Sequence, residues 1–331
     1  MQYNRNFSFD ALKLLAIFLV LWGHAIQYLS SANYVENEVY RIIYSFHMPL
    51  FMVISGYFSL NSMKNNVVPF IQKKSIQLIL PCATWSIILL LLGGIQQNIK
   101  CLPQEFIIKY IETFHLNFWF LKSAFLCYII IYIGNKLIKN EIVFYILSFI
   151  LVELTMDFYR MHTMYPSFIV GIILRKYQNI WQGKTQITVG VIIAFILLLI
   201  FWDEHLFTST KILFNNRLSD FLFNCIYKLL IGLAGALAII FTFNNIFNKI
   251  TNNFILSICK MGQYTLGVYI LQTIIIEKEL PLILSFNGVD KTCYTFAITP
   301  IISLIVLLAC VLIIKLISLS KKLSLLCFGK I

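Results

Sequence analysis

The chain has 331 residues, of which 60% are hydrophobic and only 12% charged, and its mean hydropathy is +0.83. Soluble globular proteins do not need so much apolar surface, so the composition excludes that class and indicates a polytopic membrane protein. The net charge of +12 at pH 7 is attributed to membrane topology, and we predict no nucleic-acid partner from it.

Apolar runs separated by polar breaks recur along the chain, and a helix needs about 20 apolar residues to cross a bilayer. We therefore predict an all-α fold: a transmembrane bundle of about ten helices with both termini cytoplasmic. The fifth and sixth runs are short for a full crossing. The ten runs are Phe9–Leu29, Ile42–Leu60, Ile76–Ile95, Phe118–Ile138, Ile142–Met156, Tyr165–Leu174, Ile187–Trp202, Phe221–Phe243, Tyr264–Leu284 and Tyr294–Ser318.

The distribution of charge agrees with this topology. With both termini inside, the inner side and inner helix ends carry 16 of the 26 Lys and Arg residues but two of the 14 acids. Loops that stay in the cytoplasm retain positive charge, so the basic balance is a signal of orientation. The polar gaps 96–117 and 203–220 are the longest and are loop-sized, so we predict one integral-membrane domain over residues 1–331 and no soluble domain.

The N-terminus and the cysteines leave alternatives open. Arg5 precedes an apolar core, so a cleaved signal peptide is an alternative to a first spanning helix. The first run is long enough to span, which favours the helix. The eight cysteines contain no CxxC pair and most act as small hydrophobes, although Cys101 and Cys293 both fall on the predicted outer side, where a disulfide is an alternative.

Three ionisable residues lie in the first predicted helix, where charge is costly enough to suggest function. At about 100° per residue, Lys13 and His24 lie within about 20° of each other and Asp10 within about 60° of both. The rise places His24 about 16 Å farther along the helix than Lys13. The structural alternatives are a salt bridge between Asp10 and Lys13 at the interface and a neutral, hydrogen-bonded His24.

The second run contains the segment SFHMPLFMVISGYF, which carries His47 in apolar surroundings. By the predicted boundaries, His47 lies at the same depth as His24. Two imidazoles at one depth suit proton transfer, because their pKa lies near neutral pH. They lack a convincing third ligand, so we predict no metal. Pro49, Ser55 and Gly56 would shape the helix around this site.

Basic residues also gather after the second run, where Lys64, Lys73 and Lys74 precede Pro81. They serve either as ordinary cytoplasmic anchors or as a site that binds phosphate groups through electrostatic attraction.

Two further candidates lie in the fourth and fifth runs. Glu153 is predicted to be buried and in need of a partner, for which Lys122 is the candidate. Trp119 stands at a helix end, where an interfacial anchor is the ordinary role.

Several of these motifs together resemble the membrane-bound acyltransferase 3 family. The specific ones are Asp10-Ala11-Leu12-Lys13 leading to Gly23-His24, and Phe46-His47-Met48-Pro49-Leu50-Phe51 followed by Ser55-Gly56-Tyr57. Looser matches cover most of the remaining chain. They are Lys73-Lys74 before Pro81, Trp119-Phe120-Leu121, Tyr165-Pro166 with Gly171, and Gly262-Gln263-Tyr264-Thr265-Leu266-Gly267-Val268-Tyr269.

The resemblance implies a multi-pass enzyme of the bacterial inner membrane that moves an acyl group, usually acetyl, from cytoplasmic acetyl-CoA to hydroxyls of glycans or lipid-linked sugars. It implies that His24 is the catalytic base or transient acyl carrier and that Lys13 orients the coenzyme. Two positions depart from the family pattern. Gln77 replaces a frequent arginine, and Gln272 replaces a frequent histidine, so we assign no catalytic role to Gln272.

The leading hypothesis is therefore an O-acetyltransferase with His24 and His47 as catalytic residues and Asp10, Lys13, Lys73 and Lys74 at the coenzyme. Ser55, Trp119 and Glu153 are candidates for substrate or structural roles. A glycan or lipid exporter is the alternative, since ten helices with a polar stripe also suit a transporter. Another acyl-CoA, such as succinyl-CoA, is a further alternative donor.

Overall fold

The computed structural model describes residues 7–63, 66–97, 103–155, 158–202, 218–247 and 252–330. Over these ranges the chain is helical and contains no strand, as the sequence predicts. Arg5, Lys64 and Cys101 lie outside the described residues, so the signal-peptide and disulfide alternatives, and the role of Lys64 among the basic residues, stay untested.

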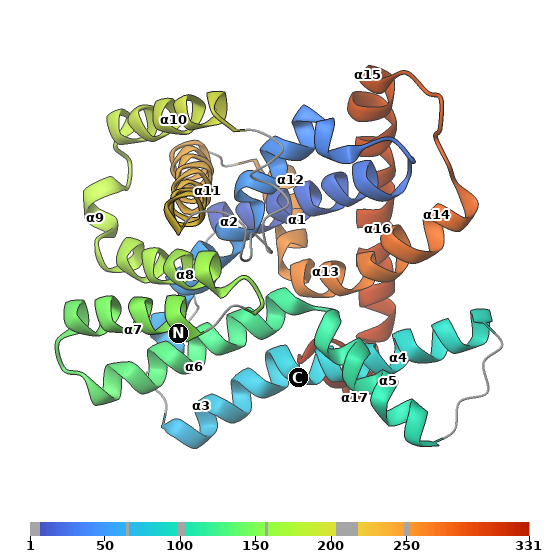
Figure 1. Cartoon of the computed structure of the whole chain (residues 1–331), viewed down its shortest axis with the longest axis horizontal. Helices are drawn as coiled ribbons and strands as arrows, with labels where there is room; N and C mark the ends of the chain where they lie inside the picture. Colours follow the sequence, from blue (N-terminus) through green and yellow to red (C-terminus); the bar gives the residue numbers. More distant parts are fainter. Residues whose placement is uncertain are drawn as a thin grey trace. The chain divides into compact units, whose positions relative to one another are not determined.

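The helices follow the apolar runs (Figure 1). The α-helices are α1 Phe7–Tyr28, α2 Glu38–Ser62, α3 Val67–Lys74, α4 Leu80–Gln97, α5 Pro103–Leu116, α6 Trp119–Leu137, α7 Glu141–Thr155, α8 Met161–Lys176, α9 Gln178–Trp181, α10 Thr185–Ile200, α11 Leu218–Phe247, α12 Asn253–Cys259, α13 Thr265–Ile274, α14 Leu280–Ile283, α15 Lys291–Cys293, α16 Thr299–Ile317 and α17 Lys321–Phe328. Short 3-10 segments are η1 Tyr34–Glu36 and η4 Lys260–Tyr264, and π-helical segments are η2 Ser75–Ile79, η5 Ile275–Glu279 and η6 Tyr294–Ile298.

Seven helices of the described chain are long and apolar enough to cross a membrane. The protein is thus a multi-pass membrane protein. The runs predicted at α7, α8 and α10 are helical but only 15, 16 and 16 residues long. The count of ten crossings and the cytoplasmic placement of the termini remain predictions.

The prediction of a loop over residues 96–117 is wrong in part, because α5 forms a helix of 14 residues there. Its charged residues are interleaved with apolar ones at helical spacing. Phe106, Tyr110 and Phe114 are half-buried, whereas Glu105 and Glu112 are exposed. This dilution lowers the hydropathy of the segment without removing its helical periodicity.

The chain forms two compact units. The first comprises the described residues of Met1–Phe58 and His162–Val311, and the second those of Ser59–Met161 and Leu312–Ile331. In the first unit, α1 packs against α11, α12, α13 and the π-helical segment η5, while α10 lies beside α11 (Figure 1). Helix α1 is thereby surrounded by neighbours, and the residues on it are positioned from several sides.

Glycines allow two close approaches in the first unit. A Cβ on Gly56 of α2 would stand 2.0 Å from the Phe168 carbonyl oxygen, and one on Gly171 of α8 would stand 2.1 Å from the Val53 carbonyl oxygen. Helices α2 and α8 thus cross with backbones in contact, as small residues permit in membranes. Gly232 of α11 likewise faces Pro49, since an added Cβ would lie 2.8 Å from the proline Cγ.

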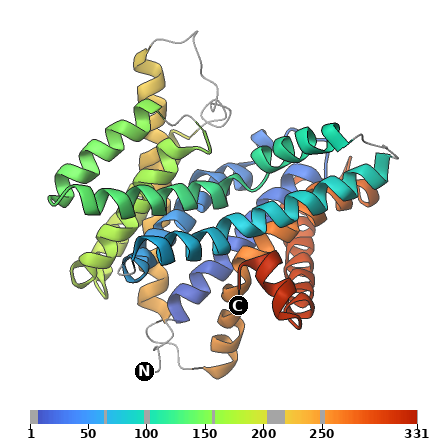
Figure 2. The ribbon, with the colours of Figure 1, turned by 90° about the horizontal axis from the view of Figure 1, so that it is seen from below.

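In the second unit, α3, η2 and α4 form one continuous rod, drawn in cyan in Figure 2. Helix α6 packs against η2 and α7, and α17 packs against α4. The indole nitrogen of Trp85 donates a hydrogen bond of 2.8 Å to the carbonyl of Cys327, which fastens α17 to α4.

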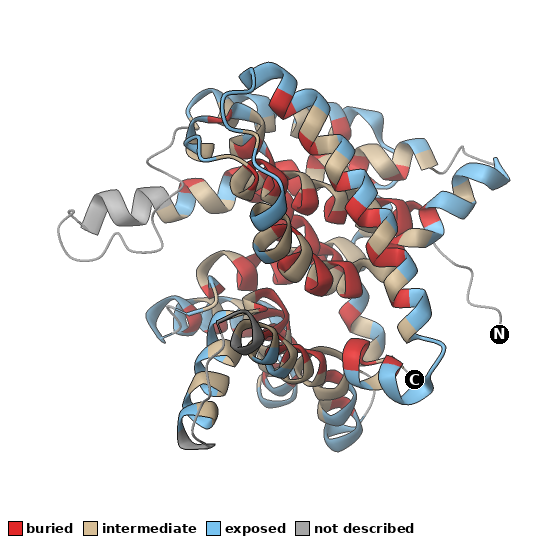
Figure 3. Cartoon of the chain, turned by 90° about the vertical axis from the view of Figure 1, so that its right-hand side faces the viewer, coloured by how far each residue is buried: buried red, intermediate tan, exposed pale blue. Residues whose placement is uncertain are grey.

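Burial follows the faces on which helices meet. Figure 3 shows buried residues, in red, on the sides of helices that face other helices, and exposed residues, in pale blue, on the outer sides. Many outer residues are large and apolar, among them Ile196 on α10, Leu151 on α7 and Ile305 on α16. Apolar side chains exposed along whole helices fit a hydrocarbon environment and would aggregate in water.

Candidate active site

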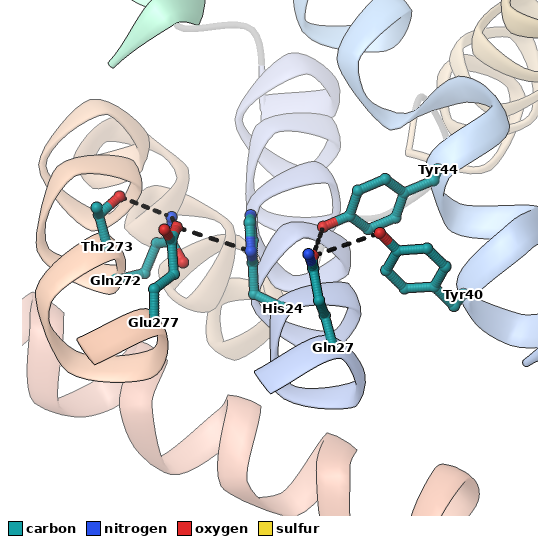
Figure 4. Close-up of polar contacts among 7 residues, drawn as sticks. All are labelled: His24, Gln27, Tyr40, Tyr44, Gln272, Thr273 and Glu277. Atoms are coloured by element: carbon teal, nitrogen blue, oxygen red, sulfur yellow. Dashed lines mark hydrogen bonds and ion pairs between the residues drawn. The ribbon is translucent and has the colours of Figure 1, made fainter. Parts of the chain in front are cut away.

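His24 lies on α1 and faces a carboxylate from a distant part of the chain. Its Nδ1 atom is 3.7 Å from Oε1 of Glu277, and the two side chains are 19% and 21% exposed. Figure 4 shows Glu277 reaching toward the imidazole from one side, while Tyr44 lies on the other. Nδ1 is buried and has no hydrogen-bond partner within the described part of the chain. Among the described residues, Glu277 is therefore the one carboxylate near the imidazole, and it faces Nδ1.

Glu277 is held in turn by Gln272. Nε2 of Gln272 donates hydrogen bonds of 2.9 Å to Oε1 of Glu277 and 3.1 Å to Oγ1 of Thr273. The Gln272 side chain is 1% exposed, and its own Oε1 finds no partner among the described residues. A buried amide that donates one hydrogen bond to a carboxylate restricts where that carboxylate can move.

Aromatic residues of α1 and α2 surround the other faces of the imidazole. The rings of His24 and Tyr28 stack with centroids 5.8 Å apart, and Tyr44 presents its ring edge-to-face at 6.1 Å. The hydroxyls of Tyr40 and Tyr44 both donate to Oε1 of Gln27, at 3.3 Å and 3.1 Å (Figure 4). Since Gln27 is one turn from His24 on α1, these bonds fix α2 against the same stretch of helix.

His47 lies in the same neighbourhood, with Tyr44 between it and His24. Its ring centroid is 4.5 Å from that of Tyr44, which in turn contacts His24. The His47 side chain is buried, and its Nδ1 lies 2.8 Å from the carbonyl oxygen of Ile43 one turn earlier. That contact assigns a proton to Nδ1, so His47 is oriented by its own helix.

Lys13 and Asp10 occupy the beginning of α1. The ammonium of Lys13 lies 4.9 Å from the ring centroid of Phe58, and Phe58 also meets the ring of Phe9 edge-on. Asp10 is buried, and its backbone lies against Gly262, where a Cβ would be 2.0 Å from the Asp10 carbonyl oxygen. The absence of a side chain at Gly262, the first residue of its motif, therefore lets η4 pack closely against this end of α1.

Ser55 is half-buried on α2, next to the crossing at Gly56. Two residues farther on, Tyr57 is covered by Arg175, whose guanidinium carbon lies 5.1 Å from the ring centroid. Arg175 Nη1 also donates to the Tyr57 hydroxyl at 3.1 Å and to Gln178 Oε1 at 2.8 Å. Arg175 was absent from the candidates based on sequence, because a basic residue at a helix end resembles an ordinary anchor.

Lys73 and Lys74 belong to the second unit and differ in exposure. Lys73 is exposed, whereas Lys74 is buried and its ammonium lies 3.6 Å from the ring centroid of Tyr128. A cation over an aromatic face is attracted by the ring quadrupole. The adjacent lysines are therefore not equivalent, although the sequence treats them as a pair.

The predicted pairing of Glu153 with Lys122 is wrong. Lys122 is buried and donates hydrogen bonds of 2.5 Å and 2.7 Å to the carbonyls of Phe114 and His115, at the end of α5. Glu153 is exposed on α7. The cation satisfies carbonyls left unpaired at a helix C-terminus, which attract positive charge. The buried residues of α7 are Phe144, Ser148 and Val152, four positions apart on one face, and Glu153 lies outside that face.

Trp119 opens α6 and lies beneath Arg160, whose guanidinium carbon is 4.9 Å from the indole centroid. Nearby, the hydroxyl of Tyr159 and Nδ1 of His115 are 3.1 Å apart. Tyr159 lies between predicted spans, and desolvation raises the pKa of its phenol, so the hydroxyl remains neutral. These contacts describe a packed junction between α5, α6 and the segment before α8, of which Trp119 is a part.

Within the described ranges, no three His, Cys, Asp or Glu side chains are grouped so as to hold a metal ion. The motifs at His24, His47 and Gly262 thus come together in the first unit around α1, with Glu277 added by the fold.

Comparison with known proteins agrees with this arrangement. A family model described as an acyltransferase domain matches residues 6–319, nearly the whole chain. The chain belongs to the acyltransferase 3 family. This membership confirms the resemblance inferred from the motifs around His24 and His47 and makes the chain a membrane protein of the acyltransferase class. No solved structure matches the chain.

Two curated relatives of this family member are both named nodulation protein NolL. The protein from Mesorhizobium japonicum is 27% identical over 226 residues, which cover 63% of this chain and 60% of the relative. The protein from Sinorhizobium fredii is 35% identical over 86 residues, covering 25% of this chain and 24% of the relative. The matched region thus spans less than two thirds of either relative.

Glu277 and Gln272 are the site residues that sequence reasoning missed. The charge distribution treats Glu277 only as one of the acids away from the cytoplasmic side, and the sequence assigns no catalytic role to Gln272. Five positions separate them, which in a regular α-helix corresponds to about 140° and thus to different faces. The π-helical segment η5 changes this register. A glutamate in an apolar helix near a histidine at the predicted depth was the available signal.

Proposed function

We propose that this protein is an O-acyltransferase that moves an acetyl group from cytoplasmic acetyl-CoA, or another group from its acyl-CoA, to a hydroxyl of a cell-surface or lipid-linked glycan. The observation that carries the proposal is a histidine within the first spanning helix, facing a carboxylate, in a member of an acyltransferase family. The predicted site of action is the inner membrane of a bacterium.

His24 would act as the general base. Its Nε2 accepts the proton of the acceptor hydroxyl while the oxygen attacks the thioester carbonyl carbon. A C–O bond forms and the C–S bond breaks, and the proton passes from His24 to the departing thiolate. The products are the O-acetyl glycan and CoA, so atoms and charge balance without a metal or an oxidant. His47 would assist through Tyr44, which lies between the two imidazoles.

Basic residues would bind the coenzyme. Lys73 and Lys74 are proposed to meet its phosphate groups, where lysine acts as a point charge. Lys13, lying about 16 Å along α1 from His24 by helical rise, is proposed to guide the thioester arm, with Asp10 beside it. Ser55 remains a candidate for substrate contact. This path assumes the predicted orientation, with the N-terminus inside.

The test compares O-acetyl content of the surface glycan in cells that produce wild type or His24→Ala at matched membrane levels. We expect the variant to lose at least about 100-fold in acetylation, the usual contribution of a positioned base. His162→Ala is the matched control, because that histidine lies at the beginning of α8 in the same unit. Unchanged acetylation in His24→Ala would remove His24 from the mechanism.

A glycan or lipid exporter is the alternative function, and a second experiment separates the two. Purified protein in lipid vesicles is given labelled acetyl-CoA and the glycan fraction of the producing cells. Label in the glycan supports acyl transfer. Movement of unlabelled, unmodified glycan across the vesicle membrane, without label in the glycan, supports transport instead.

A further inference from the structure

We propose that Glu277 is the positioning residue of His24: it holds the imidazole in the tautomer with the proton on Nδ1 and so leaves Nε2 free to accept the acceptor's proton. The inference rests on the proposed function of His24 as a base. It assigns a role to a carboxylate that lies 253 positions away in the sequence and meets His24 only through the fold.

The geometry places the carboxylate at one particular nitrogen. Oε1 of Glu277 is 3.7 Å from Nδ1 of His24. This nitrogen is buried and has no other partner among the described residues. An N–H left unpaired in such a place is costly, so a carboxylate acceptor beside it favours the Nδ1–H tautomer. Figure 4 shows Glu277 and the imidazole directed toward each other.

Among the described groups that contact His24, Glu277 is the one suited to this role. Tyr28 stacks on the ring from α1 and Tyr44 meets it from α2. Both are phenols, and the Tyr44 hydroxyl is already engaged with Gln27. Glu277, from η5, is the negatively charged group facing the imidazole among the described residues. It therefore also stabilises the imidazolium that forms when Nε2 takes a proton.

Gln272 and the π-helical turn hold the carboxylate in place. Gln272 donates 2.9 Å to the same Oε1 that faces His24. π-helical turns occur frequently at functional sites because they redirect side chains, and Glu277 stands in the middle of η5, Ile275–Glu279. The distance of 3.7 Å exceeds a hydrogen bond, and such contacts tighten when substrate binds.

The first measurement is the rate of acetyl transfer by the purified full chain in lipid nanodiscs, with acetyl-CoA and the glycan fraction of the producing cells. Glu277→Leu keeps the volume of the side chain and removes the acceptor. We expect kcat to fall about 10- to 100-fold, the effect of removing a carboxylate that orients a functional histidine at metal sites, with KM for acetyl-CoA unchanged. Glu277→Gln retains an oxygen acceptor without charge and should recover part of the rate.

The second measurement reads the tautomer directly and does not depend on activity. The ¹⁵N chemical shifts of the His24 ring are recorded in the same nanodiscs and assigned by their loss in His24→Ala. In wild type we expect a protonated Nδ1 and an unprotonated Nε2, and in Glu277→Leu a shift toward the opposite tautomer. Glu279→Leu, on the same π-helical segment, should change neither the tautomer nor the rate.

The outcomes separate the two proposals. An unchanged His24 tautomer in Glu277→Leu overturns the positioning role, and so does a changed tautomer with wild-type kcat. If wild type transfers no acetyl group, the proposed function fails, and the ¹⁵N shifts alone decide whether Glu277 sets the tautomer. A changed tautomer together with a lower kcat and a constant KM supports the assignment.

Discussion

The hydroxyl of Tyr44 donates a hydrogen bond of 3.1 Å to Oε1 of Gln27. Its ring is at the same time the aromatic surface between His24 and His47. One side chain of α2 thus does two things: its oxygen ties α2 to α1, and its ring separates the two imidazoles that the sequence places at one depth. These two contributions can be tested separately.

Tyr44→Phe removes the hydroxyl and keeps the ring. Gln27 retains its bond from Tyr40, so we expect a loss of stability of about 1 kcal/mol, typical of one hydrogen bond, and acetyl transfer within about threefold of wild type. Tyr44→Ala removes the ring too and leaves a cavity beside both histidines, which costs about 3–5 kcal/mol and most of the rate. Thermal unfolding in detergent and initial rates measure both effects. A Tyr44→Phe variant without activity would show that the phenol itself takes part in the chemistry.

Gly262→Ala is predicted to disturb the beginning of α1. The new Cβ would stand 2.0 Å from the carbonyl oxygen of Asp10, which is backbone and cannot rotate away. Forced separation of packed elements costs about 1–3 kcal/mol or more, so we expect a lower unfolding temperature. Gly190→Ala on α10 is the matched control, because a Cβ there meets nothing within 4 Å, and alanine stabilises helices relative to glycine. Equal melting temperatures for the two variants would contradict the close approach.

Lys122→Met is predicted to weaken the junction between α5 and α6 without touching the chemistry. Methionine keeps the length of the side chain, but the carbonyls of Phe114 and His115 lose their donor. A hydrogen bond made by a charged group contributes about 1.5–3 kcal/mol, so the melting temperature should fall. Lys139→Met, at an exposed position just after α6, should leave it unchanged. We expect KM for acetyl-CoA to stay at the wild-type value in both variants, and an altered KM in Lys122→Met would place this lysine nearer the coenzyme than we infer.

The sequence predicts the helices well because hydropathy and period are local properties. All ten predicted apolar runs fall on helices, and the motifs at His24, His47 and Gly262 mark the elements that gather around α1. Gly56 and Gly171, which carried the resemblance as isolated residues, prove to be the contact between α2 and α8. The helices and the motifs could be predicted since each depends on residues close together in the chain, whereas the contact between α2 and α8 is known only from the structure.

Long-range pairings could not be predicted in the same way. Lys122 donates to two backbone carbonyls of a helix that the sequence predicts as a loop. A search for an acidic side chain to pair with Lys122 therefore cannot find this partner. Glu277 meets His24 through a π-helical turn whose altered period has no clear signature in hydropathy. Both errors arise because backbone groups and helix register, which decide the contacts, are not visible in residue types.

Lys73 and Lys74 are predicted to respond differently to the same substitution. Lys73 is exposed, so Lys73→Gln should weaken acetyl-CoA binding several-fold, and the difference from wild type should shrink as salt screens the phosphates. Lys74 lies over Tyr128 at 3.6 Å, so Lys74→Gln should weaken binding and also lower the melting temperature, through loss of a contact of about 0.5–2 kcal/mol. Titration with acetyl-CoA at low and high salt, with unfolding measured in parallel, distinguishes the two. Lys322→Gln on α17, an exposed position of the same unit, controls for a general change in charge. If Lys74→Gln binds acetyl-CoA as tightly as wild type and only its melting temperature falls, Lys74 does not meet the coenzyme and its contact with Tyr128 is structural.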